Sequence, residues 1–193
     1  MELGVGTGHS ALTVFTVGHS NHPWQRFVEQ LRRHQIDVLV DTRSAPHSRV
    51  APHFDRSAIA RSLRGRDIRY LYLGGELGGR PAGQEFYDER GHVLYRRVAA
   101  TKSFQVAISR LLTGVERGYR IALLCAEENP LHCHRRLLVG RVLQEEGVTL
   151  WHIRRSGRAQ SEAELLREAE RDDPALTQPA LFAPRKDDEW TST

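Results

Sequence analysis

Short apolar runs alternate with amphipathic helical patterns along this chain, and that alternation constrains its fold more than any other feature. Apolar runs typical of buried strands recur five times, at residues 12–17, 38–40, 69–73, 119–124 and 149–153. Helical periodicity occupies the intervals between them, over residues 23–34, after Asp55, over residues 93–117 and from Cys133 onward. Strands that alternate with helices form mostly parallel sheets with helices on both faces. We therefore expect a Rossmann-like α/β domain.

Start signals support two of these helices. Pro23 suits the first position of the first predicted helix, with Asn21 or His22 as its N-cap. Asp55 is placed to cap the second. A side-chain oxygen at an N-cap accepts a hydrogen bond from a main-chain N–H group that has no partner within the helix.

The end of the chain differs from the rest. Ser161 and Glu164 form a capping box, which predicts a short charged helix that ends near residue 171. The residues after this helix contain three prolines and little periodicity, which predicts a mobile tail. We therefore divide the chain into a single α/β domain over residues 11–155 and a region over residues 156–193 that holds the helix and the tail.

Length and composition indicate a soluble globular protein. The 193 residues suit one domain, and 39% hydrophobic with 27% charged side chains is ordinary for such a chain. No apolar run approaches the roughly 20 residues that span a membrane. Residues 1–8 lack the basic and apolar segments of a secretory signal. Two cysteines without other signs of export predict reduced thiols and a cytoplasmic location.

The net charge of +4 is unevenly distributed. Residues 1–160 hold 24 basic and 15 acidic side chains, whereas residues 161–193 hold 4 and 9. Nearly all of the cations are arginine, whose planar guanidinium group suits phosphate. A basic body of this kind is consistent with DNA or a nucleotide as a partner. An arginine-for-lysine bias in a GC-rich genome explains the same composition equally well.

Polar residues follow the predicted strands, and the carboxyl ends of parallel strands meet at one edge of a sheet. His19 follows the first strand, Asp41 and Arg43 follow the second, and Glu127 follows the fourth. A carboxylate beside arginine stays ionised, so Asp41 is suited to act as a base, a nucleophile or a stabiliser of positive charge. His19 is suited to transfer protons near neutral pH. The alternatives are a loop-capping role for Asp41 and a turn histidine at position 19.

A second cluster combines thiols and imidazoles, namely Cys125, His132, Cys133 and His134. Zinc sites usually draw their ligands from two short-spaced pairs, and only one cluster occurs here, so we expect no metal and no other cofactor. The first turn of a helix that starts at Cys133 favours an anion or a thiolate, because of its free N–H groups and its dipole. Alternatively, Cys133 packs in the core while Arg135 binds an anionic substrate.

Several motifs follow one another in a fixed order: residues 18–21 with Phe27, residues 40–43 with Pro46, Ser48 and Arg49, Tyr70 with residues 77–79, and residues 124–127 with residues 133–135. Together they resemble the family called domain of unknown function 488. The resemblance covers residues 16–153. It implies an α/β fold and no particular reaction, so function has to be argued from the residues themselves.

These motifs and strand ends supply two groups of candidate site residues. The candidate catalytic residues are Asp41, His19, Glu127, Cys125 and Cys133. The candidate substrate-binding residues are Ser20, Arg43, Arg49, Tyr70, Gly78, Gly79, His134 and Arg135.

The predicted tail contains Gln178, Leu181 and Phe182, spaced as in the pentapeptide by which many bacterial replication and repair proteins bind the sliding clamp. This resemblance implies a partner protein, because such a segment inserts apolar side chains into a preformed groove. Pro179 stands where the pentapeptide often has leucine, a departure that weakens docking. The alternative is that Leu181 and Phe182 pack against the body of the protein.

Three functions fit these features. The favoured one is a DNA-associated enzyme, such as a repair hydrolase that cleaves an N-glycosidic bond with Asp41 or Glu127 as its carboxylate. The second is a thiol-dependent enzyme that acts on a phosphorylated or nucleotide substrate through Cys125 or Cys133. The third is a non-catalytic module that binds nucleic acid or another anion in its crevice.

Overall fold

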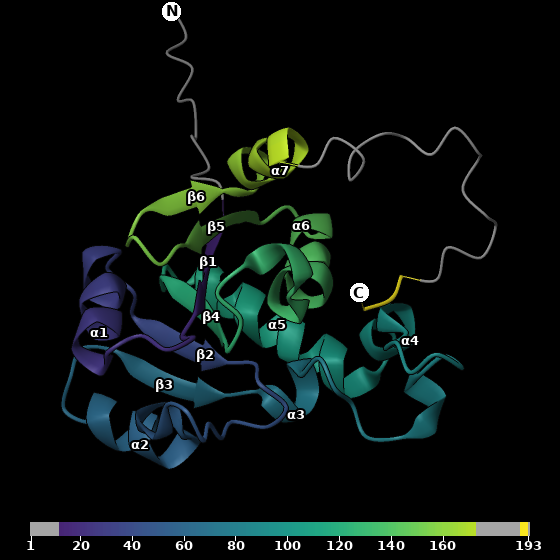
Figure 1. Ribbon diagram of the computed structural model, residues 1–193, viewed down its shortest axis with the longest axis horizontal. Helices are drawn as coiled ribbons and strands as arrows, with labels where there is room; N and C mark the ends of the chain where they lie inside the picture. The colour runs from purple at the N-terminus through teal and green to yellow at the C-terminus, as the bar shows by residue number, and fades with distance from the viewer. Residues whose placement is uncertain (1–11, 173–189, 193) are drawn as a thin grey trace, which may run out of the picture.

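The computed structural model describes residues 12–172 and 190–192, which form a mostly parallel sheet with helices on both faces (Figure 1). The six strands lie in the order β3-β2-β4-β1-β5-β6, and β6 alone runs antiparallel to its neighbour. The predicted Rossmann-like α/β class is confirmed. The strands are β1 (Thr13–Gly18), β2 (Val38–Asp41), β3 (Arg69–Tyr72), β4 (Ile121–Cys125), β5 (Thr149–Ile153) and β6 (Ala159–Ser161).

Helices and short turns connect the strands. The α-helices are α1 (Trp24–Arg33), α2 (Arg56–Leu63), α3 (Gly74–Leu77), α4 (Tyr95–Ala99), α5 (Lys102–Glu116), α6 (Arg141–Glu145) and α7 (Glu162–Asp172). Three 3-10 turns are η1 (Pro52–Phe54), η2 (Gln84–Phe86) and η3 (Pro130–His132), and the π-helical segment η4 (Arg135–Gly140) leads directly into α6. Within the described residues, no helix is long and apolar enough to cross a membrane.

The sheet separates two apolar cores, because successive side chains of a strand point to opposite faces. Helices α1 and α2 pack on one face, against Phe15, Leu39 and Leu124. Helices α5 and α6 pack on the other, against Val40 and Leu123. Strand β4 is buried along its whole length, since both of its faces are covered and strands lie on both sides of it.

The helix starts are partly as predicted. The N-cap of α1 is Pro23 itself, without a side-chain hydrogen bond, so neither Asn21 nor His22 caps it. Asp55 precedes α2, but its carboxylate accepts from the main-chain N–H of Ser48, at 2.8 Å, instead of capping the helix. The capping box of α7 is confirmed. Its hydroxyl and carboxylate each accept from the other residue's main-chain N–H, at 3.2 and 2.9 Å.

Three segments differ from the sequence-based expectation. Strand β6 extends the sheet past residue 155, and the helix expected over residues 93–117 is divided into α4 and α5. The segment expected to be a mobile tail includes residues 190–192, which pack on the body. Trp190 donates from its indole nitrogen to the carbonyl of Leu137, at 2.6 Å, and Thr191 forms a bridge with Leu94. An aromatic side chain with one apolar face and one N–H donor explains this docking.

The chain leaves the middle of the sheet in two directions. After β1 it passes through α1 to β2 on one side of β4, and after β4 it passes through α6 to β5 on the other side of β1. Ligand sites of open α/β sheets form at such a switch point, outside the carboxyl ends of the strands. The register brings Gly18 level with Cys125, and Asp41 level with Leu124. The predicted convergence of His19, Asp41 and Cys125 at one sheet edge is therefore confirmed.

Candidate functional site

A cleft of about 660 Å³ opens at this edge of the sheet. Its wall includes both thiols of the chain, Cys125 and Cys133, together with the ring of His134. Arg80 and Glu127 are exposed side chains of opposite charge on the same cleft. The cleft therefore combines polarisable sulfur, imidazole and charge, which are the groups expected of a binding or reaction site.

The two sulfur atoms and one ring nitrogen meet in a compact cluster. Nδ1 of His134 lies 3.6 Å from Sγ of Cys125 and 4.0 Å from Sγ of Cys133. Nε2 of the same ring lies 2.9 Å from the main-chain carbonyl of Thr42. A carbonyl only accepts, so Nε2 carries the proton and Nδ1 presents its lone pair to the thiols.

The two thiols titrate as a pair. A hydrogen bond from the Cys133 thiol holds the pKa of Cys125 well below its ordinary value, against the opposing effect of burial. The same hydrogen bond holds the pKa of Cys133 well above its ordinary value. The positive charge of Arg135 also favours the Cys125 thiolate. The pair therefore holds one thiolate, centred on Cys125, more readily than two.

The predicted helix does not start at Cys133. The helix starts one residue later, at His134, and the main-chain carbonyl of Cys133 accepts its first hydrogen bond, from the N–H of Leu137 at 2.9 Å. Cys133 is the extended residue between η3 and His134, with φ −111° and ψ 134°. Cys133 therefore lies at the N-terminal end of the helix, directly before its first turn, and the second thiol lies beside Cys125.

Arg135 holds the loop that connects the two thiols. Its side chain is 1% exposed and donates to the main-chain carbonyls of Glu127 and Glu128, the latter at 2.7 Å. Nε also bonds the Thr16 hydroxyl at 3.3 Å. The guanidinium that we predicted to bind substrate is therefore turned into the protein, where it orders the loop after β4.

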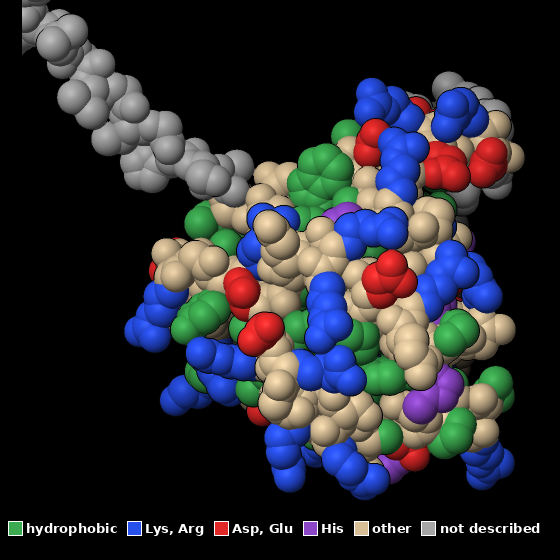
Figure 2. All heavy atoms as spheres, turned by 90° about the vertical axis from the view of Figure 1, so that its left-hand side faces the viewer, with side chains coloured by type: hydrophobic (Ala, Val, Ile, Leu, Met, Phe, Trp, Pro, Cys, Tyr) green, Lys and Arg blue, Asp and Glu red, His purple; other side chains and the backbone are tan. Residues whose placement is uncertain are grey.

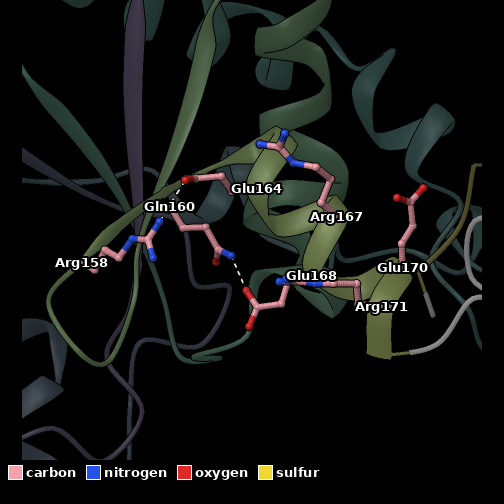
Figure 3. Close-up of a pocket in the computed structure, with 7 residues that line it drawn as sticks. All are labelled: Arg158, Gln160, Glu164, Arg167, Glu168, Glu170 and Arg171. Atoms are coloured by element: carbon pink, nitrogen blue, oxygen red, sulfur yellow. Dashed lines mark hydrogen bonds and ion pairs between the residues drawn. The ribbon is translucent and has the colours of Figure 1, made fainter.

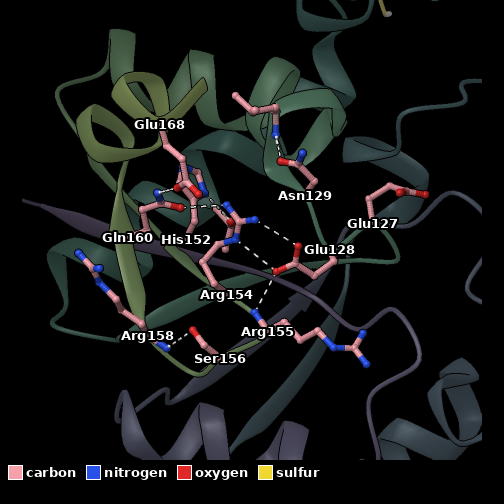
Figure 4. A network of polar contacts seen from close by, with 12 residues as sticks. Glu127, Glu128, Asn129, His152, Arg154, Arg155, Ser156, Arg158, Gln160 and Glu168 are labelled. Atoms are coloured by element: carbon pink, nitrogen blue, oxygen red, sulfur yellow. Dashed lines mark hydrogen bonds and ion pairs between the residues drawn. The ribbon is translucent and has the colours of Figure 1, made fainter. Parts of the chain in front are cut away.

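A polar network supports the same loop from the other side (Figure 4). Oε1 of Glu128 accepts from Nε of Arg154 at 3.2 Å and from the main-chain N–H of Arg155 at 2.9 Å. These bonds hold the pKa of Glu128 below its ordinary value, against the opposing effect of burial. Gly18 lies beneath the loop, where a Cβ atom would come within 1.8 Å of the Glu127 carbonyl. The close contact of β1 and the loop thus requires glycine.

Asp41 and Arg43 form a buried ion pair beside the cleft. Asp41 is 0% exposed, and its carboxylate accepts from Nε and Nη2 of Arg43, at 2.9 and 2.6 Å. The hydroxyl of Tyr70 donates to the same carboxylate at 2.7 Å. Arg43 also donates to Nε2 of His19 at 2.9 Å and to the carbonyl of Phe54 at 2.8 Å. Both charged groups are satisfied within the protein, which indicates a structural role at this edge of the sheet.

The remaining predicted residues have varied surroundings. Ser20 is a turn residue with φ 41°, and its carbonyl accepts from Nδ1 of His19. Arg49 is exposed on the loop before η1. Gly79 lies against the ring of His134, and a Cβ atom there would come within 2.6 Å of Cγ. A Cβ atom at Gly78 would likewise meet the Ser44 hydroxyl, at 2.2 Å. Gln178, Leu181 and Phe182, the residues that resemble a clamp-binding peptide, lie outside the described residues.

One wall of the cleft was not predicted from the sequence. It comes from the irregular segment after α3 and from the end of the chain, and it includes Arg80, Tyr87, His92, Tyr95 and Ser192. Burial raises the pKa of the Tyr95 phenol to about 12, with a smaller contribution from the thiols. The glycine-rich composition of this segment marked a loop but gave no periodicity that would place its side chains.

A second hollow lies along α7 and β6 (Figure 3). Two polar contacts lie within it: Arg158 donates to Glu164 at 2.9 Å, and the amide of Gln160 donates to Glu168. Neither thiol contributes to it. We therefore place the candidate site at the cleft of the sheet edge.

The fold places this chain in the class of mostly parallel α/β proteins. A thiol–imidazole cluster lies at the switch point of its sheet. A family model described as domain of unknown function 488 matches residues 23–142, more than half of the chain. The chain belongs to this family. A search of the curated proteins and a search of the solved structures found no match.

Proposed function

We propose that the protein is a thiol-dependent enzyme that acts on a phosphorylated or nucleotide substrate in the cleft. The observation that carries the proposal is the cluster of Cys125, Cys133 and His134 in the cleft wall. A cysteine thiolate beside an imidazole is a common reaction centre. Arg80, exposed on the same cleft, supplies a positive charge for a phosphate group.

The carboxylate route of the favoured sequence hypothesis has less support. Cleavage of an N-glycosidic bond requires a carboxyl group next to the sugar. Asp41 is buried and fully engaged with Arg43 and Tyr70, so it does not reach a substrate in this conformation. Glu127 is the exposed acidic candidate of the cleft.

Loss of the Cys125 sulfur is expected to lower turnover by more than about 100-fold, the usual contribution of a group that takes part in the reaction. The measurement is turnover of a panel of nucleotides and sugar phosphates by the wild type and by Cys125→Ser. Ser109→Ala, an exposed change on α5, is the control. Iodoacetamide should inactivate the wild type. Activity that survives both alkylation and Cys125→Ser would refute thiol dependence. Ligand binding without turnover would instead favour the non-catalytic module.

A DNA-associated role is a second candidate, favoured by the distribution of arginine. Basic side chains outnumber acidic ones over the face that holds α1 and α2 (Figure 2). The exposed arginines of these helices and the turn after α2 are Arg26, Arg32, Arg33, Arg56, Arg61, Arg64 and Arg66. Such a surface suits the phosphate backbone of DNA.

Duplex DNA binding should therefore weaken steeply with salt. Replacing Arg61 and Arg64 together by Ala is expected to make the slope of log K against log salt shallower by about two, one for each lost phosphate contact. Titrations at several salt concentrations measure the slope, with Arg110→Ala on α5 as the control. Equal slopes in all three proteins would remove DNA from the candidate partners of this face.

A further inference from the structure

The cluster in the cleft has the composition of a metal site. One ligand atom from each of Cys125, Cys133 and His134 lies within 4.8 Å of the other two. Two sulfurs and one imidazole nitrogen form a soft donor set, which selects thiophilic cations such as Zn²⁺ over Mg²⁺ or Ca²⁺. The pattern differs from the two short-spaced pairs of a structural zinc site, so the sequence did not predict it.

The distances within the cluster suit a tetrahedral cation. Bond lengths of about 2.3 Å to sulfur and 2.0–2.1 Å to nitrogen give a sulfur–nitrogen edge of about 3.6 Å in a tetrahedron. The observed edges from Nδ1 of His134 are 3.6 Å to Cys125 and 4.0 Å to Cys133. The third edge, between the two sulfurs, is at most 4.8 Å, so all three donor atoms lie close enough to share one cation.

The surroundings of His134 are those of a metal ligand. A metal-bound histidine normally donates its other ring N–H to a carbonyl or carboxylate, which fixes the tautomer and the ring plane. Nε2 of His134 meets the Thr42 carbonyl at 2.9 Å, and this contact leaves the Nδ1 lone pair directed at the sulfurs. Gly79 makes room for the ring, since a Cβ atom there would lie 2.6 Å from Cγ.

We infer that Cys125, Cys133 and His134 bind a thiophilic divalent cation, such as Zn²⁺, with its fourth coordination position open to the cleft. Three protein ligands with an open position are the arrangement of catalytic rather than structural zinc sites. The open position is available to water or to an anionic oxygen of the substrate. With the cation bound, the thiols act as its ligands and not as nucleophiles, and turnover still requires the sulfur of Cys125. Only the catalytic role of the cation depends on the proposed function, because binding itself is measured without a substrate.

Cobalt reports on this site directly. We expect the reduced, metal-free protein to bind one Co²⁺ per chain, with the intense visible bands of tetrahedral Co²⁺ and thiolate-to-cobalt charge transfer in the near ultraviolet. Zn²⁺ should displace the cobalt and bleach both signals. Cys125→Ser, Cys133→Ser and His134→Gln are each expected to weaken binding by more than about 100-fold, since loss of an outer partner alone costs 10–100-fold.

Matched variants separate ligand loss from general damage. His132→Gln removes an exposed imidazole of the same cleft that lies outside the cluster, and it should leave Co²⁺ affinity unchanged. Gly79→Ala keeps all three ligands but displaces the ring of His134, so it should weaken binding about tenfold. Gly75→Ala, whose new Cβ atom meets nothing within 4 Å, is its control. Circular dichroism verifies that each variant is folded.

Several results would overturn the inference: no tetrahedral Co²⁺ spectrum for the wild type, equal losses in His132→Gln and His134→Gln, or full thiol reactivity in the presence of Zn²⁺. Failure here and failure of the proposed function are distinguishable. A chelator-treated protein that still turns over through Cys125 would leave the thiol enzyme standing without the metal. Tetrahedral Co²⁺ binding in a protein that turns over no member of the substrate panel would leave the metal site standing without the enzyme.

Discussion

Asp41→Asn is expected to lower the free energy of unfolding by about 3–5 kcal/mol, the usual cost of removing one partner of a buried ion pair. Asp41 is 0% exposed, and Arg43, its partner, is 4% exposed. The amide would leave the guanidinium in the interior without a compensating charge. Such a loss is a large fraction of the stability of an ordinary domain. Equilibrium unfolding in urea measures it.

Three companion variants test the reason for this loss. Tyr70→Phe removes only a neutral donor to the carboxylate and should cost about 1 kcal/mol. Asp67→Asn changes an exposed carboxylate and should stay within about 0.5 kcal/mol of the wild type. Asp41→Leu combined with Arg43→Met removes both charges and should cost less than Asp41→Asn alone. An Asp41→Asn protein with full stability but no activity would instead return Asp41 to the catalytic candidates.

Much of the fold was predictable because each strand and helix is encoded by a pattern of neighbouring residues. All five strands of the parallel part were expected within a residue or two of their observed bounds, since each is a short apolar run between turn-forming residues. The positions of His19, Asp41 and Cys125 followed from the rule that parallel strands end at one edge. Strand β6 was missed because its three residues, at an edge of the sheet, carry no apolar run.

The roles of the site residues depend on contacts that no local pattern encodes. In the sequence, Asp41 beside Arg43 is equally compatible with an exposed catalytic pair and with a buried ion pair. Tyr70 and the carbonyl of Phe54, distant in sequence, complete the bonding that keeps the pair inside. The cluster of Cys125, Cys133 and His134 likewise depends on contacts that no local sequence pattern encodes. Its ligand geometry arises because η3 and the extended residue Cys133 carry the chain back over the end of β4.

Protonation of His19 should destabilise the protein in mild acid. The ring is 3% exposed and stacks on Phe54 with centroids 4.4 Å apart. Arg43 only donates, so Nε2 accepts from it at 2.9 Å, and Nδ1 donates to the Ser20 carbonyl at 2.8 Å. A second proton would abolish the acceptor and place a charge next to a guanidinium. Burial, above all, lowers the pKa of His19 to about 4 from the ordinary value of 6.5.

The sign of the pH effect follows from this lowered pKa. Between pH 6.5 and 4 the unfolded chain binds a proton at His19 that the folded protein does not, so stability falls as the pH falls through this window. The contribution of His19 is unaffected above pH 6.5. At about 1.4 kcal/mol per pH unit, the loss approaches 3 kcal/mol by pH 4.

A His19→Gln variant isolates this contribution. Glutamine does not titrate, so its free energy of unfolding should fall by about 3 kcal/mol less than that of the wild type between pH 7 and pH 4. The pKa values of His22 and His152 are also lowered, mainly by burial, but both residues are present in the two proteins and their effects cancel. His132→Gln, which removes an exposed imidazole, should follow the wild-type curve. Parallel curves for the wild type and His19→Gln would mean that His19 accepts its proton as readily in the folded protein as in the unfolded chain. In that case the Arg43–His19 hydrogen bond does not hold the ring neutral.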